Sequence, residues 1–144
     1  MKPIAFEYGV DLAPDEDTIL VTSPDFPELV TFGDSESDAL SHALGAFIAI
    51  LSARIDDQEN IPLPSPRRKG PKVSLPPLIA GKIALYLAMR EQGVSQSELA
   101  RKLKCDPKQI RRLLDPVNSS RQEHIDAALK ALGKKLVVSL ADAA

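Results

Sequence analysis

The sequence is poor in cysteine and aromatic residues: it contains one cysteine, no tryptophan, four phenylalanines and two tyrosines in 144 residues. Cys105 therefore has no partner for a disulfide within the chain, and a cysteine cluster that would bind zinc is excluded. No uninterrupted apolar run approaches the ~20 residues that a membrane helix needs, and the first 18 residues have no apolar core of a secretory signal. We therefore expect a cytoplasmic protein with no membrane partner.

Basic residues are almost missing from the first 60 positions. Residues 1–60 hold two basic side chains against thirteen acidic ones, a balance of −11. Residues 61–144 hold sixteen basic against seven acidic, a balance of +9, so the net charge of −2 conceals two oppositely charged halves. Two solvated surfaces of chance composition would explain this split, but such complete segregation favours a different partner for each half.

The first half is predicted to contain short strands and one long helix. Alternating β-formers predict strands over residues 4–10, 18–23 and 29–33, the first two joined as a hairpin by an acidic turn at residues 13–17. A helix is predicted over residues 35–57, with Ser35 as its N-cap, Asp38 completing the cap, and an apolar stripe formed by Leu40, Leu44, Phe47, Ile48 and Leu51. A proline-rich extended connector follows, and residues 72–75 can add a last strand.

The second half is predicted to be helical. Helical periodicity and cap residues predict helices over residues 78–93, 95–104, 106–115 and 119–133. The first would bury Ile79, Ile83 and Leu87 on one side and end at Gly93. The last would bury Ile125, Ala128, Leu129 and Leu132. The β-prone segment "KKLVVSL" at residues 134–140 follows, and it either pairs with its counterpart across a dimer or packs against its own domain.

The second and third of these helices are joined so closely that they indicate a helix-turn-helix unit. Ser95 with Glu98 and Asp106 with Gln109 are cap patterns, Pro107 suits a first helical position, and only Cys105 lies between the helices. The third helix would direct Lys and Arg, which suit guanine, and Gln, which suits adenine, toward the DNA major groove. The candidate DNA-binding residues are Ser95, Gln96, Lys108, Gln109, Arg111, Arg112, Asn118, Ser120 and Arg121. The alternative is a plain helical bundle with solvated charges.

Several stretches in one order along the chain resemble the HicB-type antitoxins with a C-terminal helix-turn-helix domain of the phage-repressor type. They are "SPDFPELVTFGDSESDALSHA" (residues 23–43), "NIPLPSP" (60–66), "SQSELARKL" (95–103) and "ALKALGKKLVVSL" (128–140). Together they span nearly the whole chain. The sequence departs from the family where Glu28 and Leu29 follow Pro27, since the family often has Gly and Cys there.

The resemblance implies an α+β protein of two domains. Residues 1–76 would form a partial ribonuclease-H-like domain of three to four strands and one helix, with the connector within residues 60–76. Residues 77–144 would form the all-α helix-turn-helix domain. The first domain would bind and mask a small basic, mRNA-cleaving toxin of the HicA type. The second would bind operator DNA as part of a homo-oligomer, a dimer or a tetramer, and repress the pair's operon.

The acidic first half suits such a basic toxin, and the basic second half suits DNA phosphates. Charge and loop position alone select the candidate toxin-binding residues, which are Asp15, Glu16, Asp17, Asp25 and Glu28. Masking by steric cover requires no catalytic residue, no metal and no cofactor, and we expect none.

Two other functions remain as alternatives. A nuclease would need carboxylates converging on Mg²⁺, whereas the acidic residues of the first half fall mostly in predicted turns without strand-centred spacing. Cys105 lies in the tight turn, and His42 and His124 occupy helical patterns, so no nucleophile is assembled. A one-component repressor with a small-molecule-sensing first half is the second alternative, and the scarcity of aromatic residues counts mildly against it.

Overall fold

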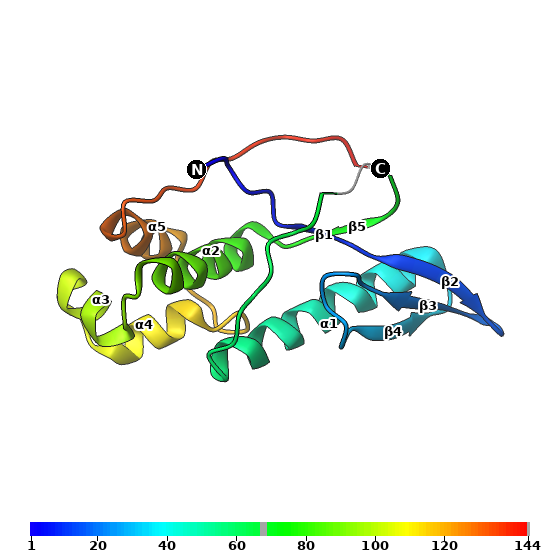
Figure 1. Ribbon diagram of the computed structural model, residues 1–144, viewed down its shortest axis with the longest axis horizontal. Helices are drawn as coiled ribbons and strands as arrows, with labels where there is room; N and C mark the ends of the chain where they lie inside the picture. Colours follow the sequence, from blue (N-terminus) through cyan, green and yellow to red (C-terminus); the bar gives the residue numbers. More distant parts are fainter. Residues whose placement is uncertain (67–68, 144) are drawn as a thin grey trace. The chain divides into compact units, whose positions relative to one another are not determined.

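The computed structural model describes residues 1–66 and 69–143 (Figure 1). The chain divides into two compact units. Unit 1 comprises the described residues of Met1–Arg54, Asn60–Leu75 and Asp142–Ala144, and unit 2 comprises Ile55–Glu59 and Pro76–Ala141. Strands and one helix precede four helices along the chain, so the predicted α+β class is confirmed.

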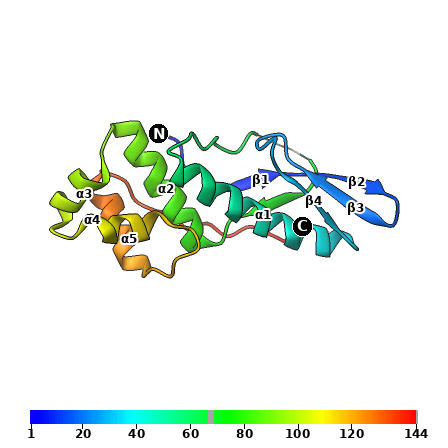
Figure 2. The ribbon, with the colours of Figure 1, turned by 90° about the horizontal axis from the view of Figure 1, so that it is seen from below.

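Unit 1 contains five short strands in two antiparallel sheets. Strand β1 (Glu7–Gly9) pairs with β5 (Lys72–Ser74). Strands β2 (Asp11–Asp15), β3 (Thr18–Thr22) and β4 (Val30–Gly33) form the second sheet in the order β2-β3-β4. Figures 1 and 2 show this three-stranded sheet lying alongside the long helix of the unit.

The predicted hairpin between residues 4–10 and 18–23 is wrong in its strand pairing. The segment predicted as one strand is divided at Val10 into β1 and β2, and β1 pairs with β5 instead of β3. Residues 13–15, predicted as part of an acidic turn, belong to β2, and Asp15 pairs with Thr18 across a turn of only Glu16 and Asp17. Pro14 is tolerated because β2 is an edge strand, where a missing N–H breaks no ladder.

The long helix α1 runs over Glu36–Asp56, and its predicted N-cap is confirmed. The hydroxyl of Ser35 accepts a hydrogen bond of 3.1 Å from the amide of Asp38. The carboxylate of Asp38 accepts in return from the amide of Asp34 at 2.8 Å, so this side of the cap lies one residue earlier than in a standard capping box.

The predicted buried stripe of α1 requires correction. The residues that are buried are Ala39, Ala43, Phe47, Leu51 and Ile55, each four positions after the last, whereas Leu40, Leu44 and Ile48 are only half-buried. At the first residue of this stripe, Ala39, helix and sheet approach closely at Gly33. A Cβ atom added to Gly33 would lie 2.2 Å from the backbone nitrogen of Ala39, so only small side chains fit at this contact.

Helix α1 is also long and apolar enough, by length and composition alone, to cross a membrane. Its apolar residues are interrupted by polar ones, so the sequence contains no uninterrupted apolar run of that length. Core helices of globular domains pass the same test, and the fully buried side chains Phe47 and Leu51 of α1 belong to the core of unit 1. We therefore describe α1 as the core helix of this unit.

Three aromatic rings form the centre of unit 1. Tyr8 of β1, Phe26 of the loop before β4 and Phe47 of α1 are fully buried, with ring centroids 5.0 to 5.5 Å apart. The hydroxyl of Tyr8 donates to the carbonyl of Pro62 at 2.8 Å, and burial raises the pKa of this phenol far above its ordinary value. Half of the chain's six aromatic residues therefore join β1, the β3–β4 loop and α1.

The proline-rich connector is docked on unit 1. Ile61 is buried, the carbonyl of Asn60 accepts from Arg54 at 2.8 Å, and the backbone and hydroxyl of Ser65 donate to Asp25. The segment is extended as predicted, but most of it has fixed partners in this unit. Arg67 and Arg68 of the predicted connector lie outside the described residues.

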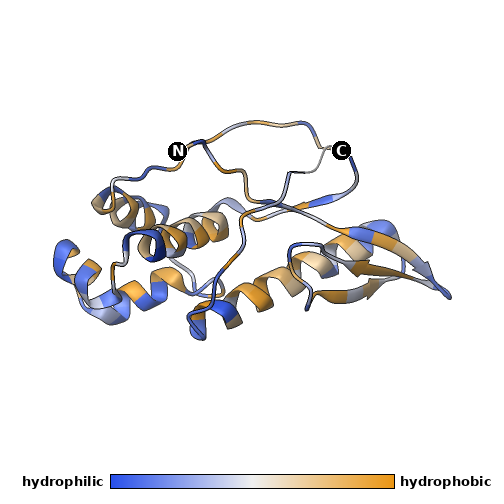
Figure 3. Cartoon of the chain, viewed as in Figure 1, coloured by the Kyte–Doolittle hydropathy of each residue, from blue (hydrophilic) through white to orange (hydrophobic). Residues whose placement is uncertain are grey.

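Unit 2 contains all four predicted helices: α2 (Pro77–Gln92), α3 (Gln96–Leu103), α4 (Pro107–Leu114) and α5 (Gln122–Ala131). Helix α2 ends at Gly93, whose φ of 64° is left-handed as a C-terminal stop requires. The one-sided stripe predicted for α2 is wrong, because Lys82, Ile83, Leu85 and other residues around the helix are buried. Figure 3 shows the largely apolar composition of this central helix.

The end of the chain forms no strand within the described residues 134–143. Leu136 packs over Gly81 of α2, where its Cδ1 lies 3.2 Å from the position of an added Cβ. Val138 and Leu140 are 95% and 101% exposed. The β-prone segment thus contacts its own unit through Leu136 and through Lys134, which forms a 3.7 Å ion pair with Glu91, whereas Val138 and Leu140 face solvent.

Candidate nucleic-acid interface and acidic surfaces

The helices α3 and α4 begin at the caps that the sequence predicts. The amide of Glu98 donates to the hydroxyl of Ser95 at 3.1 Å, and the amide of Lys108 donates to the carboxylate of Asp106 at 2.8 Å. Pro107 takes the first position of α4, where its missing N–H costs no hydrogen bond. Each helix has only eight residues, so these caps and the packing against α2 and α5 determine where they begin.

The turn between α3 and α4 differs from the prediction in one residue. Helix α3 ends at Leu103, so Lys104 and Cys105 both lie between the helix and the Asp106 cap. Lys104 adopts the left-handed conformation, with φ of 56°, and the amide of Cys105 donates to the carbonyl of Ala100 at 3.0 Å. The left-handed residue of the turn is therefore Lys104 and not Cys105, the one residue predicted to lie between the helices.

Helix α4 separates its apolar and polar residues completely. Ile110, Leu113 and Leu114 are buried. The remaining side chains after Pro107 are exposed; they are Lys108, Gln109, Arg111 and Arg112. This confirms the predicted outward orientation of the four side chains, and it gives α4 a face with three cations and one amide.

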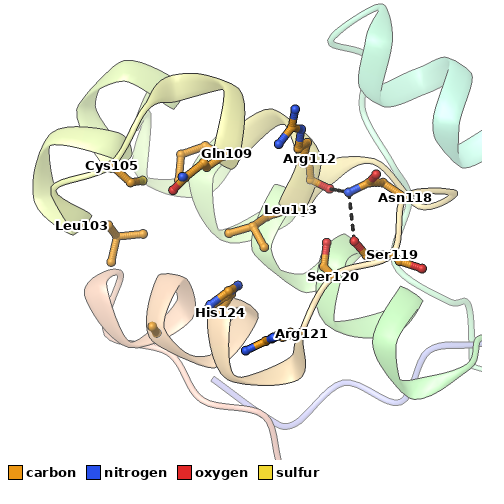
Figure 4. Close-up of a pocket in the computed structure, with 12 residues that line it drawn as sticks. Leu103, Cys105, Gln109, Arg112, Leu113, Asn118, Ser119, Ser120, Arg121 and His124 are labelled. Carbon is orange, nitrogen blue, oxygen red and sulfur yellow. Dashed lines mark hydrogen bonds between the residues drawn. The ribbon is translucent and has the colours of Figure 1, made fainter.

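A groove of about 770 Å³ lies beside this face of α4 (Figure 4). Gln109 and Arg112 of α4 line one side, and Ser120, Arg121 and His124 line the side formed by the start of α5. Asn118 and Ser119 lie between them in the α4–α5 loop. Five of the nine candidate DNA-binding residues meet here: Gln109, Arg112, Asn118, Ser120 and Arg121. Sequence reasoning missed Ser119 and His124 as lining residues.

Two other candidates lie in a different hollow. Gln96 of α3 and Arg111 of α4 line a space of about 430 Å³ together with the carboxylates of Asp56 and Asp115. These carboxylates reduce the positive potential around Arg111, in contrast to the groove with Arg112 and Arg121. Ser95 and Lys108 line neither space. The nine candidates therefore do not form one continuous site.

The α4–α5 loop is held by its own side chains. The side-chain amide of Asn118 donates to the carbonyl of Ser119 at 3.1 Å and lies 3.5 Å from that of Arg112. Asn118, Ser120 and Arg121 precede α5 instead of lying within it, since the helix begins at Gln122. Arg121 is highly exposed, and its guanidinium forms a 3.5 Å ion pair with Glu123. Arg121 therefore presents its charge to solvent at the edge of the groove, beside one carboxylate.

Lys82 is a buried cation directly behind this groove. Its side chain is fully buried in α2, and its ammonium donates to the carbonyls of Arg112 and Leu113 at 2.9 and 3.2 Å and to the hydroxyl of Ser120 at 2.7 Å. The two carbonyls belong to the last turn of α4, where the helix dipole is negative, so a cation is stabilised there. One side chain thus joins the end of α4 to the loop before α5.

Burial and charge act in opposite directions on Lys82. Burial lowers the pKa of its ammonium, and the carboxylate of Asp115 counters this effect. The burial of Lys82 is not evident from the sequence, because a lysine in an amphipathic helix is expected on the solvent side. The only available signal was its position among the apolar residues Ile79, Ile83 and Tyr86.

The acidic candidates of unit 1 occupy two separate places. Asp15 at the end of β2 and Glu16 and Asp17 in the β2–β3 turn are exposed at one end of the sheet. Glu16 is left-handed, with φ of 54°, which is unusual for a residue other than glycine. The three carboxylates form a compact negative tip on the hairpin.

Asp25 and Glu28 are engaged within the unit. Asp25 accepts two hydrogen bonds from Ser65. Glu28 accepts from the Nε and Nη2 atoms of Arg54 at 3.1 and 2.9 Å, and this bonding holds the pKa of its carboxyl below the ordinary value. The guanidinium of Arg54 also lies 5.0 Å from the ring centroid of Phe26. Arg54 therefore compensates the negative charge of Glu28, whereas Asp25 keeps its charge and is held in place by Ser65.

Comparison with known proteins gives consistent matches along the chain. Residues 7–84 match the family model described as HicB_like antitoxin of bacterial toxin-antitoxin system. The chain is 31% identical over 139 residues to an antitoxin HicB of Pseudomonas fluorescens, covering 95% of both chains. It is 35% identical over 134 residues to an antitoxin HicB of Photorhabdus laumondii, covering 93% of this chain and 91% of the relative. It is 32% identical over 131 residues to an antitoxin HicB of Escherichia coli K12, covering 90% and 95%.

Proposed function

Because the chain belongs to the HicB-like antitoxin family of bacterial toxin–antitoxin systems, we propose that it neutralises a small basic toxin and represses its own operon. The toxin would be an mRNA-cleaving ribonuclease of the HicA type. The observation that carries this proposal is the opposite charge of the two parts of one chain, −11 over residues 1–60 and +9 over residues 61–144. One part suits a cationic protein, and the other suits a polyanion.

Toxin neutralisation is assigned to unit 1 and works by steric cover of the toxin's RNA-binding surface. Such masking needs no catalytic group, no metal and no cofactor on the antitoxin. The candidate contacts remain Asp15, Glu16, Asp17, Asp25 and Glu28, of which the first three are the most accessible charges. Complementary charge accelerates the encounter of the two proteins, which matters because a free toxin would cleave mRNA while it waits for its antitoxin.

Repression is assigned to unit 2, with α3, the turn and α4 acting as a helix-turn-helix element. Lys108, Gln109 and Arg112 on the exposed face of α4 would read base edges in the major groove. Ser120, Arg121 and the polar rim of the 770 Å³ groove would hold the sugar–phosphate backbone beside it. Ser95 and Gln96 at the start of α3 would meet a phosphate, and Arg111 and Asn118 would complete the contacts.

A single element of this kind reads few base pairs, so the repressor acts as a homo-oligomer, a dimer or a tetramer. Two copies of unit 2 would bind half-sites about 34 Å apart, one turn of DNA, or a multiple of that distance. The exposed segment with Val138 and Leu140 is available to pair with its counterpart in such an assembly. Both activities place the protein in the cytoplasm with its toxin, its mRNA targets and its operon.

Two measurements test the proposal separately. Co-expression with the HicA-like toxin encoded beside this gene should restore growth, and the two proteins should purify as one complex. The purified chain should shift DNA from its own promoter, with an affinity that falls steeply as salt rises because phosphate contacts release counterions. Growth arrest despite co-expression would refute the antitoxin activity, and equal affinity for promoter and unrelated DNA would refute specific repression.

A further inference from the structure

The outer face of the β2-β3-β4 sheet carries exposed apolar side chains beside acidic ones. Successive residues of a strand point to opposite faces, and the register places Ala13, Leu20 and Phe32 in one row and Asp11, Thr22 and Val30 in the next. The opposite face includes Gly33, which lies against Ala39 of α1. The outer face is therefore the one that α1 does not cover. We call it the open sheet face, defined by Asp11, Ala13, Asp15, Leu20, Val30 and Phe32.

Two large apolar residues on this face are unusually accessible. Phe32 is 43% exposed and Val30 is 59% exposed, and both belong to the edge strand β4. They stand two positions apart, so their side chains lie next to each other on the same face. Adjacent exposed apolar side chains on one rigid strand are typical of a protein-binding surface, whereas scattered single ones are not. An aromatic ring held on a strand also loses little conformational freedom when a partner covers it.

The acidic residues of the same face indicate the chemistry of the partner. Asp11 and Asp15 lie on β2, across β3 from Val30 and Phe32, and Glu16 and Asp17 continue the charge into the turn. The face is thus apolar along one edge and negative along the other. An apolar centre bordered by charge of one sign suits a partner with an apolar patch bordered by cations.

A second copy of this chain is the less suitable occupant. Residues 1–60 have a balance of −11, so two such surfaces would meet with like charges that gain no compensation from each other. A small basic protein instead neutralises the acidic strand and buries the apolar one in the same contact. Charge complementarity therefore selects the cationic partner.

We propose that the open sheet face is the toxin-docking surface, with Phe32 and Val30 as its apolar anchors and the acidic β2 strand as its steering edge. This inference rests on the proposed antitoxin function and makes it specific. Asp25 and Glu28 lie outside the docking surface, because Ser65 and Arg54 already engage them. The toxin contacts expected from sequence thereby narrow to the hairpin that carries Asp15, Glu16 and Asp17.

The test measures affinity for the toxin encoded beside this gene, purified as a catalytically inactive variant, by isothermal titration. The double variant Val30→Thr/Phe32→Thr removes the apolar anchors while keeping residues that suit exposed strands. Its affinity should fall at least about tenfold. The control Leu63→Thr changes another exposed apolar residue of unit 1, 52% accessible and in the connector instead of a strand, and should leave the affinity unchanged.

A second pair of variants separates the electrostatic contribution to the encounter rate from the apolar contribution to affinity. Asp15→Asn/Asp17→Asn should reduce the association rate and its salt dependence, while Glu36→Gln, which removes an exposed acidic charge at the start of α1, should change neither. Circular dichroism and promoter binding verify that each variant is folded.

The other possible outcomes of the binding experiment overturn either this inference or the antitoxin function. Equal toxin affinity of the double variant and the parent chain would overturn this inference and leave the antitoxin function standing. No binding by the parent chain would refute the antitoxin function itself. A homodimer of the parent chain that the double variant weakens, seen by light scattering, would assign the open sheet face to self-association and would also overturn the inference.

Discussion

The ammonium of Lys82 lies 2.7 Å from the hydroxyl of Ser120, and the same ammonium donates to the carbonyls of Arg112 and Leu113. A buried charge is expensive unless hydrogen bonds satisfy it, and three acceptors do so here. These acceptors come from the end of α4 and from the loop before α5. The contact therefore fixes the helix that would read DNA relative to the loop that would hold its backbone.

Lys82→Met should weaken promoter binding about tenfold, or ~1.4 kcal/mol, although the side chain touches no DNA. Methionine fills a similar volume but leaves two carbonyls and one hydroxyl without their donor, so the loop before α5 loses its attachment. The exposed Lys130→Met variant makes the same change in net charge and serves as the control. Affinity is measured by fluorescence anisotropy under conditions where both variants are fully folded. Equal effects of the two substitutions would reduce the role of Lys82 to its charge.

Arg112→Ala should cost roughly 1–3 kcal/mol of promoter binding and relax the preference at one base position. The reason is its place on the exposed face of α4, at the edge of the groove. Binding to a promoter library with every base varied in turn gives both quantities. Unchanged affinity of this variant would show that α4 does not enter the major groove.

Arg121→Ala should instead weaken binding to all sequences about equally and reduce the slope of affinity against salt by about one unit. Arg121 is highly exposed and lies before α5, off the recognition face of α4, so we expect it to contact a phosphate and not a base edge. A salt titration on promoter and unrelated DNA distinguishes the two arginines. A change in base preference with this variant would contradict its assignment to the backbone.

Sequence determined the helices of unit 2 well because their signals are local. The residues that begin or end these helices interact with neighbouring backbone groups, so the helix ends can be inferred without knowledge of the tertiary fold. They are Ser95, Asp106, Pro107 and Gly93. The outward orientation of Arg112 follows from the 3.6-residue period in the same way. The end of α3 was predicted one residue too late, because Lys104 and not a glycine takes the left-handed conformation that ends the helix.

Strand pairing and the burial of side chains around the sites depend on contacts between residues far apart in the sequence. Local sequence patterns do not reveal such contacts. Strand β1 pairs with β5, more than sixty residues away, and Pro14 lies in a strand because that strand is an edge. Burial of Lys82 follows from the packing of α2 against α4 and α5. The small residue at Ala39 of α1 follows from Gly33, which brings sheet and helix close together at that point.

Glu28→Gln should make the free energy of unfolding of unit 1 depend less on pH between neutral and acidic conditions. The hydrogen bonds from Arg54 lower the pKa of Glu28 in the folded state, so its contribution is present above the ordinary pKa near 4.5. That contribution is lost as pH falls through the lower folded value. The carboxylate is 44% exposed, so the effect should stay below about 1 kcal/mol. Urea unfolding at pH 7 and pH 3 should show a smaller difference for the variant than for the parent chain; an identical difference would contradict the pair's contribution.

Gly33→Ala should destabilise unit 1 by about 1–3 kcal/mol, because its Cβ would lie 2.2 Å from the nitrogen and 2.4 Å from the Cα of Ala39. Both atoms belong to the backbone, so α1 must move away from β4. Gly45→Ala on α1 is the matched control: its Cβ would meet nothing within 4 Å, and alanine favours a helix by up to about 1 kcal/mol. Hydrogen exchange of β3 and β4 amides measures both effects within this unit. If Gly33→Ala protected these amides as well as Gly45→Ala does, the close approach of sheet and helix would not hold.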